Sequence, residues 1–431
     1  MARYDRIAPL PAPAREAVFP GWLVLADLEG RERDAELARR ARLRFLALRP
    51  LRRILAVGPD GATAASYARQ IEGIREELGH LPARDPERIR LSRYLHEIET
   101  RSPAELALAA AGLGELAEDA GHAAAAEEFY RTALELGERF DLTAARAVAR
   151  RRLGLLCATL GRTTDAEREL TAAVDAAAAA GAHGEWARAS SAAALLALAR
   201  GDGARARATL GDVLKQGRTW SDAETQSVAG AALSQVLLAA GEAESALENA
   251  WSALERAGDP STRAAALHAA GMALRALGLY DAAARSHDLV VREPAVGPSD
   301  RWRAEGELAT TLAEAGRLDE FLAARRRMLR EAREAPPAAR AAALLHLRLA
   351  QACVLAGAPD FARDHLREGL QAARRGGYGD LVGELEALLP RLERESARAL
   401  AAPGAPRSQP GARARSIADA IQAHGATAGR S

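Results

Sequence analysis

The sequence has very little of several residue types, and each shortage excludes a class of protein. The 431 residues contain only two cysteines, Cys157 and Cys353, with no C-x-x-C pair and no clustered histidines. That argues against a disulfide framework or a zinc site. No apolar run approaches the roughly 18 to 20 residues of a membrane-spanning helix, and the apolar part of residues 10–30 is too interrupted for a signal peptide. We therefore expect a soluble protein of the reducing cytoplasm without a metal ion.

The signature motifs of catalysis and nucleotide binding are missing as well. The sequence has no G-x-x-x-x-G-K-[ST], no G-x-S-x-G, no H-E-x-x-H and no acidic calcium loop. The residues GLGEL at 112–116 resemble a glycine-rich dinucleotide-binding loop in sequence. They lie inside a helical pattern with no strand before it, so they do not indicate such a site. We predict that the chain is not an enzyme and has no catalytic residues and no cofactor. The chain could be an enzyme only if residues 1–101 contained a catalytic site of an unfamiliar kind.

Lysine and asparagine are almost absent, each occurring once, as Lys215 and Asn249, beside 58 arginines. This skew indicates a GC-rich bacterial genome. The net charge is +1, so no global field attracts nucleic acid or an anionic membrane. Aromatic residues make up 4% of the chain and apolar residues 48%, many of them alanine. Alanine buries little area per residue, so the composition predicts many thin helix interfaces rather than one thick core.

A glycine recurs at a nearly constant interval, each time between two alanine- and leucine-rich stretches. The spacings are 40, 40, 40, 37, 38 and 41 residues. Glycine suits the left-handed backbone that ends a helix, so each position predicts a turn between two helices. The turn glycines are Gly121, Gly161, Gly201, Gly241, Gly278, Gly316 and Gly357.

Small residues accompany each turn glycine at fixed offsets, which predicts close helix contact. Five residues after it stand Ala126, Ala166, Ala206, Ala246, Ala283 and Ala362, with Phe321 as the exception. Seven residues before it stand Gly114, Gly154, Ala194, Ser234, Gly271, Ala309 and Ala350. With small residues at positions 8, 20, 27 and 28, glycine at 15 and a bulky residue at 24, the pattern resembles the tetratricopeptide repeat over about residues 102–376. The sixth repeat matches least well, and the period exceeds the usual value of about 34, as in the extended repeats of large bacterial transcription activators.

The resemblance implies an all-α, right-handed α-α superhelix whose first helices line a concave groove. One hairpin cannot bury its apolar stripe alone, whereas stacked neighbours can. We expect seven repeats, a capping helix over 377–400 interrupted by Pro390, and an N-terminal helical region over 1–101 docked on the first repeat. The composition of 401–431 predicts a disordered tail, with a short helical pattern in SIADAIQAHG. The expected repeats are about 102–140, 141–181, 182–218, 219–258, 259–296, 297–335 and 336–376.

The first helices offer the candidate binding residues. Their groove positions are apolar with a few arginines, which suits an amphipathic helix or extended peptide carrying acidic residues. The other interpretation is that the superhelix closes on itself and these leucines are core. The lysines and asparagines of a carboxylate clamp are missing, so a chaperone-tail adaptor is not expected. The candidate anchors are Arg151, Arg188, Leu195, Leu198, Gln235, His268 and Arg275.

The favoured function is therefore a protein- or peptide-binding scaffold, adaptor or regulator in a bacterial cytoplasmic assembly or signalling pathway. The alternative is a transcriptional or signalling regulator whose basic N-terminal helices contact nucleic acid. The segment from Arg31 to Arg53 contains nine arginines and three acidic residues. Residues 102–396 contain 35 basic and 42 acidic residues. An arginine run is more often a solvated face or an intramolecular dock. The candidate patch consists of Arg39, Arg40, Arg42 and Arg44.

Overall fold

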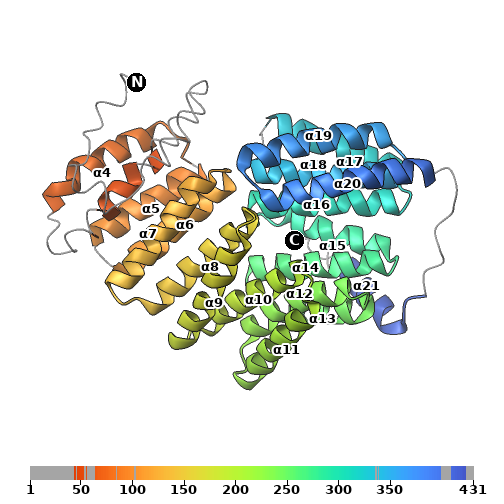
Figure 1. The fold of residues 1–431 in the computed structure, drawn as a ribbon, viewed down its shortest axis with the longest axis horizontal. Coiled ribbons are helices and arrows are strands. Elements are labelled where there is room, and N and C mark those ends of the chain that lie inside the picture. Colours follow the sequence, from red (N-terminus) through yellow and green to blue (C-terminus); the bar gives the residue numbers. More distant parts are fainter. Residues whose placement is uncertain are drawn as a thin grey trace. The chain divides into compact units, whose positions relative to one another are not determined.

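The structure, a computed structural model, describes residues 43–44, 46–52, 55, 64–83, 85–100, 103–334, 337, 339–398 and 409–423. The secondary structure of these residues is helical, and no strand occurs among them (Figure 1). The predicted all-α fold class is confirmed. The chain divides into two compact units, which are described separately. Unit 1 contains Met1–Glu118 and His122–Leu153, and unit 2 contains Asp119–Gly121 and Gly154–Ser431.

Successive helices of the repeat region pair as hairpins joined by short turns. Successive first helices also pack on one another within unit 2, as α10 on α12, α12 on α14 and α16 on α18. Each hairpin thus covers the next, as in an α-solenoid. The pairs are α6 (Pro103–Asp119) with α7 (Ala123–Arg139), α8 (Thr143–Thr159) with α9 (Thr163–Ala179), α10 (His183–Ala199) with α11 (Gly203–Thr219), α12 (Ala223–Ala239) with α13 (Ala243–Arg256), α14 (Pro260–Ala276) with α15 (Tyr280–Arg292), α16 (Pro298–Glu314) with α17 (Leu318–Glu334), and α18 (Ala339–Leu355) with α19 (Pro359–Gly376).

The turn glycines have the backbone conformation that the sequence predicts. All seven have a φ between 69° and 86°, the left-handed region that side chains with a Cβ rarely adopt. The residue after each glycine donates its N–H to a carbonyl five residues earlier, for example Arg162 to Cys157 at 2.8 Å. This Schellman arrangement satisfies the last carbonyls of the first helix.

The small residues before the turns lie where a bulky side chain of the second helix presses against the first. A Cβ on Gly114 would lie 2.4 Å from the Tyr130 ring, and one on Gly154 would lie 2.7 Å from Leu170 Cγ. The repeat therefore places a bulky residue 16 positions after each of these glycines, directly against the glycine backbone.

Gly154→Leu should lower the free energy of unfolding by about 1 to 3 kcal/mol, because the backbone N of Leu170 would also lie 3.2 Å from the new Cβ. Chemical denaturation measures the change. Gly211→Leu is the matched control: Gly211 is exposed, and a Cβ there meets nothing within 4 Å. That variant should gain roughly 0.5 to 1 kcal/mol from helix propensity. Equal stability of the Gly154 variant and the parent would contradict the helix register.

Unit 1 joins the N-terminal helices to the first repeat. It contains α4 (Ala64–Gly79) and α5 (Pro86–Thr100). Arg52 forms ion pairs with Glu128 at 2.6 Å and with Glu135, both on α7. Glu128 is 1% exposed, and burial raises its pKa to about 7 although Arg52 opposes the shift. Part of the N-terminal arginine excess thus serves intramolecular docking.

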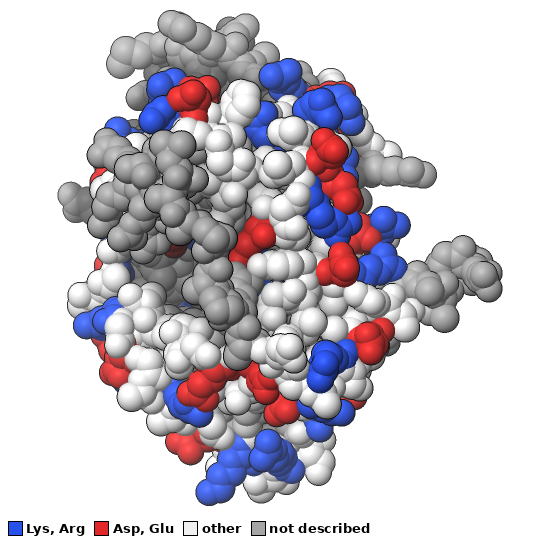
Figure 2. Space-filling model, turned by 90° about the vertical axis from the view of Figure 1, so that its right-hand side faces the viewer, with Lys and Arg blue, Asp and Glu red and all other residues white. Residues whose placement is uncertain are grey.

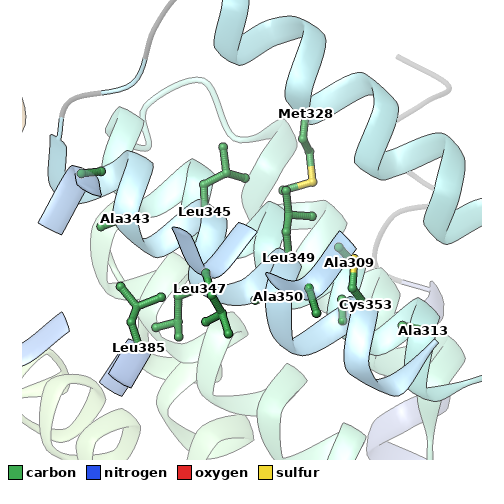
Figure 3. Packing of buried hydrophobic residues seen from close by; sticks show 14 of the residues in the cluster. Ala309, Ala313, Met328, Ala343, Leu345, Leu347, Leu349, Ala350, Cys353 and Leu385 are labelled. Carbon is green, nitrogen blue, oxygen red and sulfur yellow. The ribbon is translucent and has the colours of Figure 1, made fainter. Parts of the chain in front are cut away.

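The C-terminal hairpins of unit 2 share one apolar core with the capping helix α20 (Gly379–Arg398). Figure 3 shows leucines of α18 in this core with Met328, Cys353 and Leu385. Cys353 is fully buried and burial raises the pKa of its thiol, as expected of a core cysteine. The helix α20 continues through Pro390, where the sequence predicted an interruption. A Cβ on Gly379 would lie 3.4 Å from the Leu160 carbonyl oxygen, so the second repeat's turn touches the start of this helix.

Within the region 401–431, twelve residues form the helix α21 (Ala412–Ala423). This helix includes most of the short helical pattern predicted in SIADAIQAHG and begins four residues earlier, in the part expected to be disordered. The apolar side chains of α21 are buried against α13 and α15. So short a helix is marginal by itself in water. Tertiary contact stabilises it, and composition does not reveal that contact.

Candidate functional site

The predicted arginine anchors of the first helices are engaged within the protein. Arg188 forms an ion pair with Glu224 of the next first helix. Arg275 Nη1 lies 2.9 Å from Glu307 Oε2, again on the next first helix. Arg151 is 8% exposed. Arg188 and Arg275 thus link neighbouring repeats. The role of all three arginines as ligand anchors stays a prediction.

The other predicted anchors differ in accessibility. Leu195 and Leu198 are half-buried and pack against the core of α10 to α12, Gln235 is exposed, and His268 is half-buried. In the candidate nucleic-acid patch, Arg44 is 3% exposed, and Arg39, Arg40 and Arg42 lie outside the described residues. Two of the predicted residues, His268 and Arg275, both lie beside one buried carboxylate.

That carboxylate is Glu307 of α16, which is fully buried. Arg275 of α14 contacts one oxygen, and Arg348 Nε of α18 lies 2.9 Å from the other. Burial alone would raise the pKa of Glu307, but the charges of Arg348 and Arg275 outweigh burial and lower the pKa to about 2. The ionised carboxylate of Glu307 thus links three successive first helices, α14, α16 and α18. Repeat position predicts Arg275 as a site residue but not Glu307, because a lone glutamate in a helix carries no signal.

Two histidines border the Glu307 cluster, with ring centroids 5.7 Å apart. His287 of α15 is fully buried, and its ring packs on the backbone of Gly271. Neither ring nitrogen has a hydrogen-bond partner, and burial lowers the pKa of His287 to about 4. Burial and Arg303 also hold the pKa of His268 well below its usual value. Both rings are therefore neutral at pH 7.

A second histidine pair joins α18 to α19. His346 Nδ1 and His365 Nδ1 lie 3.0 Å apart, and Arg325 Nε donates to His365 Nε2 at 2.9 Å. Burial lowers the pKa of His365 to about 3, with His346 and Arg325 acting in the same direction. Within the described residues, no group of three or more His, Cys, Asp or Glu side chains gathers in a way that would hold a metal ion. This pair joins two helices of one hairpin.

The helix α21 occupies the groove between α13 and α15 (Figure 1). Ile417 and Ile421 are 2% and 0% exposed and belong to the same core as Leu247 of α13 and Ala283 of α15. Gly411 N–H, just before α21, donates to Glu244 Oε1 at 2.6 Å, so a carboxylate of α13 faces the positive end of the α21 dipole. The second helices of successive hairpins thus form a groove that binds an amphipathic helix.

The next groove along the repeat, between α15 and α17, contains an open cavity of about 870 Å³. Its floor is apolar and includes Leu308 and Leu312 of α16. Gln422, near the end of α21, lies at its border. Its charged lining comprises three carboxylates, Asp281, Asp288 and Glu320, and six arginines, Arg285, Arg292, Arg317, Arg326, Arg327 and Arg330. We call this the arginine groove.

Charges elsewhere on the visible surface are mixed. On the face at the right of Figure 1, basic and acidic side chains are interspersed (Figure 2). In the described part of the chain, no helix combines the length and hydrophobicity needed to cross a bilayer. The arginine groove has a net positive lining.

Comparisons with known proteins give a remote likeness. No protein-family model matches the chain, and no curated protein sequence matches it. A Rap protein complexed with competence and sporulation factor resembles it with a TM-score of 0.37 and 13% identity, over 82% of this chain and 98% of that one. The TPR domain of P58(IPK) resembles it with a TM-score of 0.23 and 14% identity, over 83% and 99%. Both scores are low, so the description of the fold rests on the helices and turns above.

Proposed function

We propose that the chain is a non-catalytic scaffold that binds helical segments of other proteins in grooves between the second helices of successive repeats. The docked α21 carries this proposal. It is a separate helix, and residues 399–411 separate it from α20 in the sequence. It nonetheless buries an apolar stripe of Ala414, Ile417, Ala418 and Ile421 between α13 and α15. An amphipathic helix lying in an apolar groove is a common mode of peptide recognition.

The first-helix face supports this function less well. Arg188 and Arg275 already have carboxylate partners on neighbouring helices. The nucleic-acid alternative draws no support from the described part of its patch, where Arg44 is buried. A role in a bacterial cytoplasmic assembly or signalling pathway fits a binding scaffold and is part of the proposal.

The test uses the full chain with Ile417→Asp and Ile421→Asp, and a fluorescently labelled peptide of residues 409–425. Burying two carboxylates without partners should expel α21, because each costs several kcal/mol. The emptied groove should then bind the peptide, whereas the tethered helix of the parent should weaken peptide binding by about 100-fold or more through its effective concentration. Fluorescence anisotropy measures both affinities.

A peptide carrying the same two substitutions is the control and should not bind either protein. Circular dichroism of the expelled variant checks that the repeats remain folded. Absence of peptide binding to a folded, expelled variant would refute the groove as a helix-binding site.

A further inference from the structure

We propose that the arginine groove binds an acidic amphipathic helix of a partner protein. The inference rests on the proposed function in one respect, that a helix lies between second helices. It adds a second site and the chemistry of its partner.

Repeat register supports the choice of a helix as the occupant. The turn glycines Gly278 and Gly316 are 38 residues apart, so Leu308 and Leu312 of α16 occupy the repeat positions of Ala270 and Leu274 of α14. Ala270 and Leu274 belong to the apolar core on which α21 lies. Leu308 and Leu312 line the open arginine groove. Both grooves thus present an apolar floor at equivalent positions, and the open one has the more bulky floor.

Charge selects the partner. Four of the groove arginines pair with nearby carboxylates: Arg285 and Arg292 both contact Asp288, Arg317 contacts Asp281 and Glu320, and Arg327 contacts Glu331, which lies outside the lining. The lining keeps an excess of three positive charges. A helix that places carboxylates along the rims and alanine or leucine on the floor would offset that excess.

Two arginines of α17 are available for such contacts. Arg326 and Arg330 are exposed, and within the described ranges neither has an ion-pair partner. They are four residues apart, so they lie on one face of the helix. Guanidinium groups bind carboxylates through paired, charge-assisted hydrogen bonds. These two side chains are the expected specificity determinants.

The sequence of α21 does not suit this groove. Between Ala412 and Ala423 it carries Arg413 and Arg415 against the single carboxylate Asp419. Its N-terminal end instead meets Glu244 in the neighbouring groove. Opposite charge preferences at the two grooves would keep α21 and an acidic partner in separate sites.

The experiment uses the full chain and a labelled synthetic peptide of 16 residues, with alanine and leucine at helical i, i+3, i+4, i+7 positions and glutamate elsewhere. A second peptide has glutamine in place of every glutamate. Fluorescence anisotropy at low and moderate salt should show at least about tenfold tighter binding of the glutamate peptide, as expected for charge-assisted contacts. Arg326→Glu with Arg330→Glu should weaken that binding by about tenfold or more.

The matched control is Arg218→Glu with Arg263→Glu, which changes the net charge equally at two exposed arginines outside the groove. It should keep the parent's affinity. Equal loss in both double variants would show non-specific attraction and overturn the proposal, as would unchanged binding to the Arg326/Arg330 variant. Self-association of the parent that this variant abolishes would identify a second copy as the occupant and also overturn it.

The two proposals fail separately. The variant that expels α21 should still bind the glutamate peptide, because it keeps all six groove arginines and the leucine floor and loses only Gln422 at the border. Failure of the glutamate peptide with success of the 409–425 peptide would refute only the second site.

Discussion

Glu307→Ala should lower the free energy of unfolding by about 3 to 5 kcal/mol, as is usual when one partner of a buried ion pair is removed. The substitution removes the carboxylate that Arg275 and Arg348 share, and these side chains are 17% and 24% exposed. Arg275 keeps its contact with Glu314 at 3.8 Å. The substitution also removes the negative charge of α16 that links this helix to Arg275 of α14 and Arg348 of α18. Chemical denaturation followed by circular dichroism measures the loss.

Two further variants test whether the loss of stability comes from leaving buried positive charge without the Glu307 carboxylate. Glu242→Ala removes a carboxylate from an exposed ion pair with Arg207 and should cost at most about 1 kcal/mol. Replacing Glu307, Arg275 and Arg348 together with leucine or methionine should restore much of the stability, because an apolar core needs no counter-charge. A loss below about 1 kcal/mol for Glu307→Ala would show that water already solvates the cluster.

The hairpin architecture is predictable from the sequence because it depends on local backbone requirements. A left-handed turn needs glycine, and two helices in close contact need a small residue opposite a bulky one. Gly154 with Leu170 and Gly114 with Tyr130 satisfy both requirements within one repeat. The turn glycine recurs at a nearly constant interval, so a single sequence displays it seven times.

The grooves between second helices are not predictable in the same way. The residues of α13 to α15 that contact Ile417 and Ile421 lie more than a hundred positions earlier in the sequence. No local sequence pattern predicts this contact. The ion-pair partners of the first-helix arginines are not predictable from the sequence either. Repeat position places Arg275 on a first helix, but only the fold shows Glu307 opposite it. A contact that joins two particular residues of different repeats need not recur in every repeat, so it leaves no periodic trace in the sequence.

His287→Leu should remove part of the acid sensitivity of the fold. The pKa of His287 is lowered to about 4 in the folded protein, whereas an unfolded histidine titrates near 6.5. Between these values the unfolded chain binds the additional proton, so the free energy of unfolding falls as the pH is lowered from 6.5 to 4. The difference corresponds to on the order of 3 kcal/mol by pH 4.

Leucine is a suitable replacement because the repeat already uses it at this position. Leu170 packs on Gly154 as His287 packs on Gly271. Neither ring nitrogen of His287 has a hydrogen-bond partner to lose, so the variant should be at least as stable as the parent at pH 7, and its advantage should grow as the pH falls to 4. Denaturation at a series of pH values measures this difference. Some acid sensitivity should remain, because the pKa of His365 is lowered to about 3. Parallel pH profiles for parent and variant would show that protonating His287 does not limit stability.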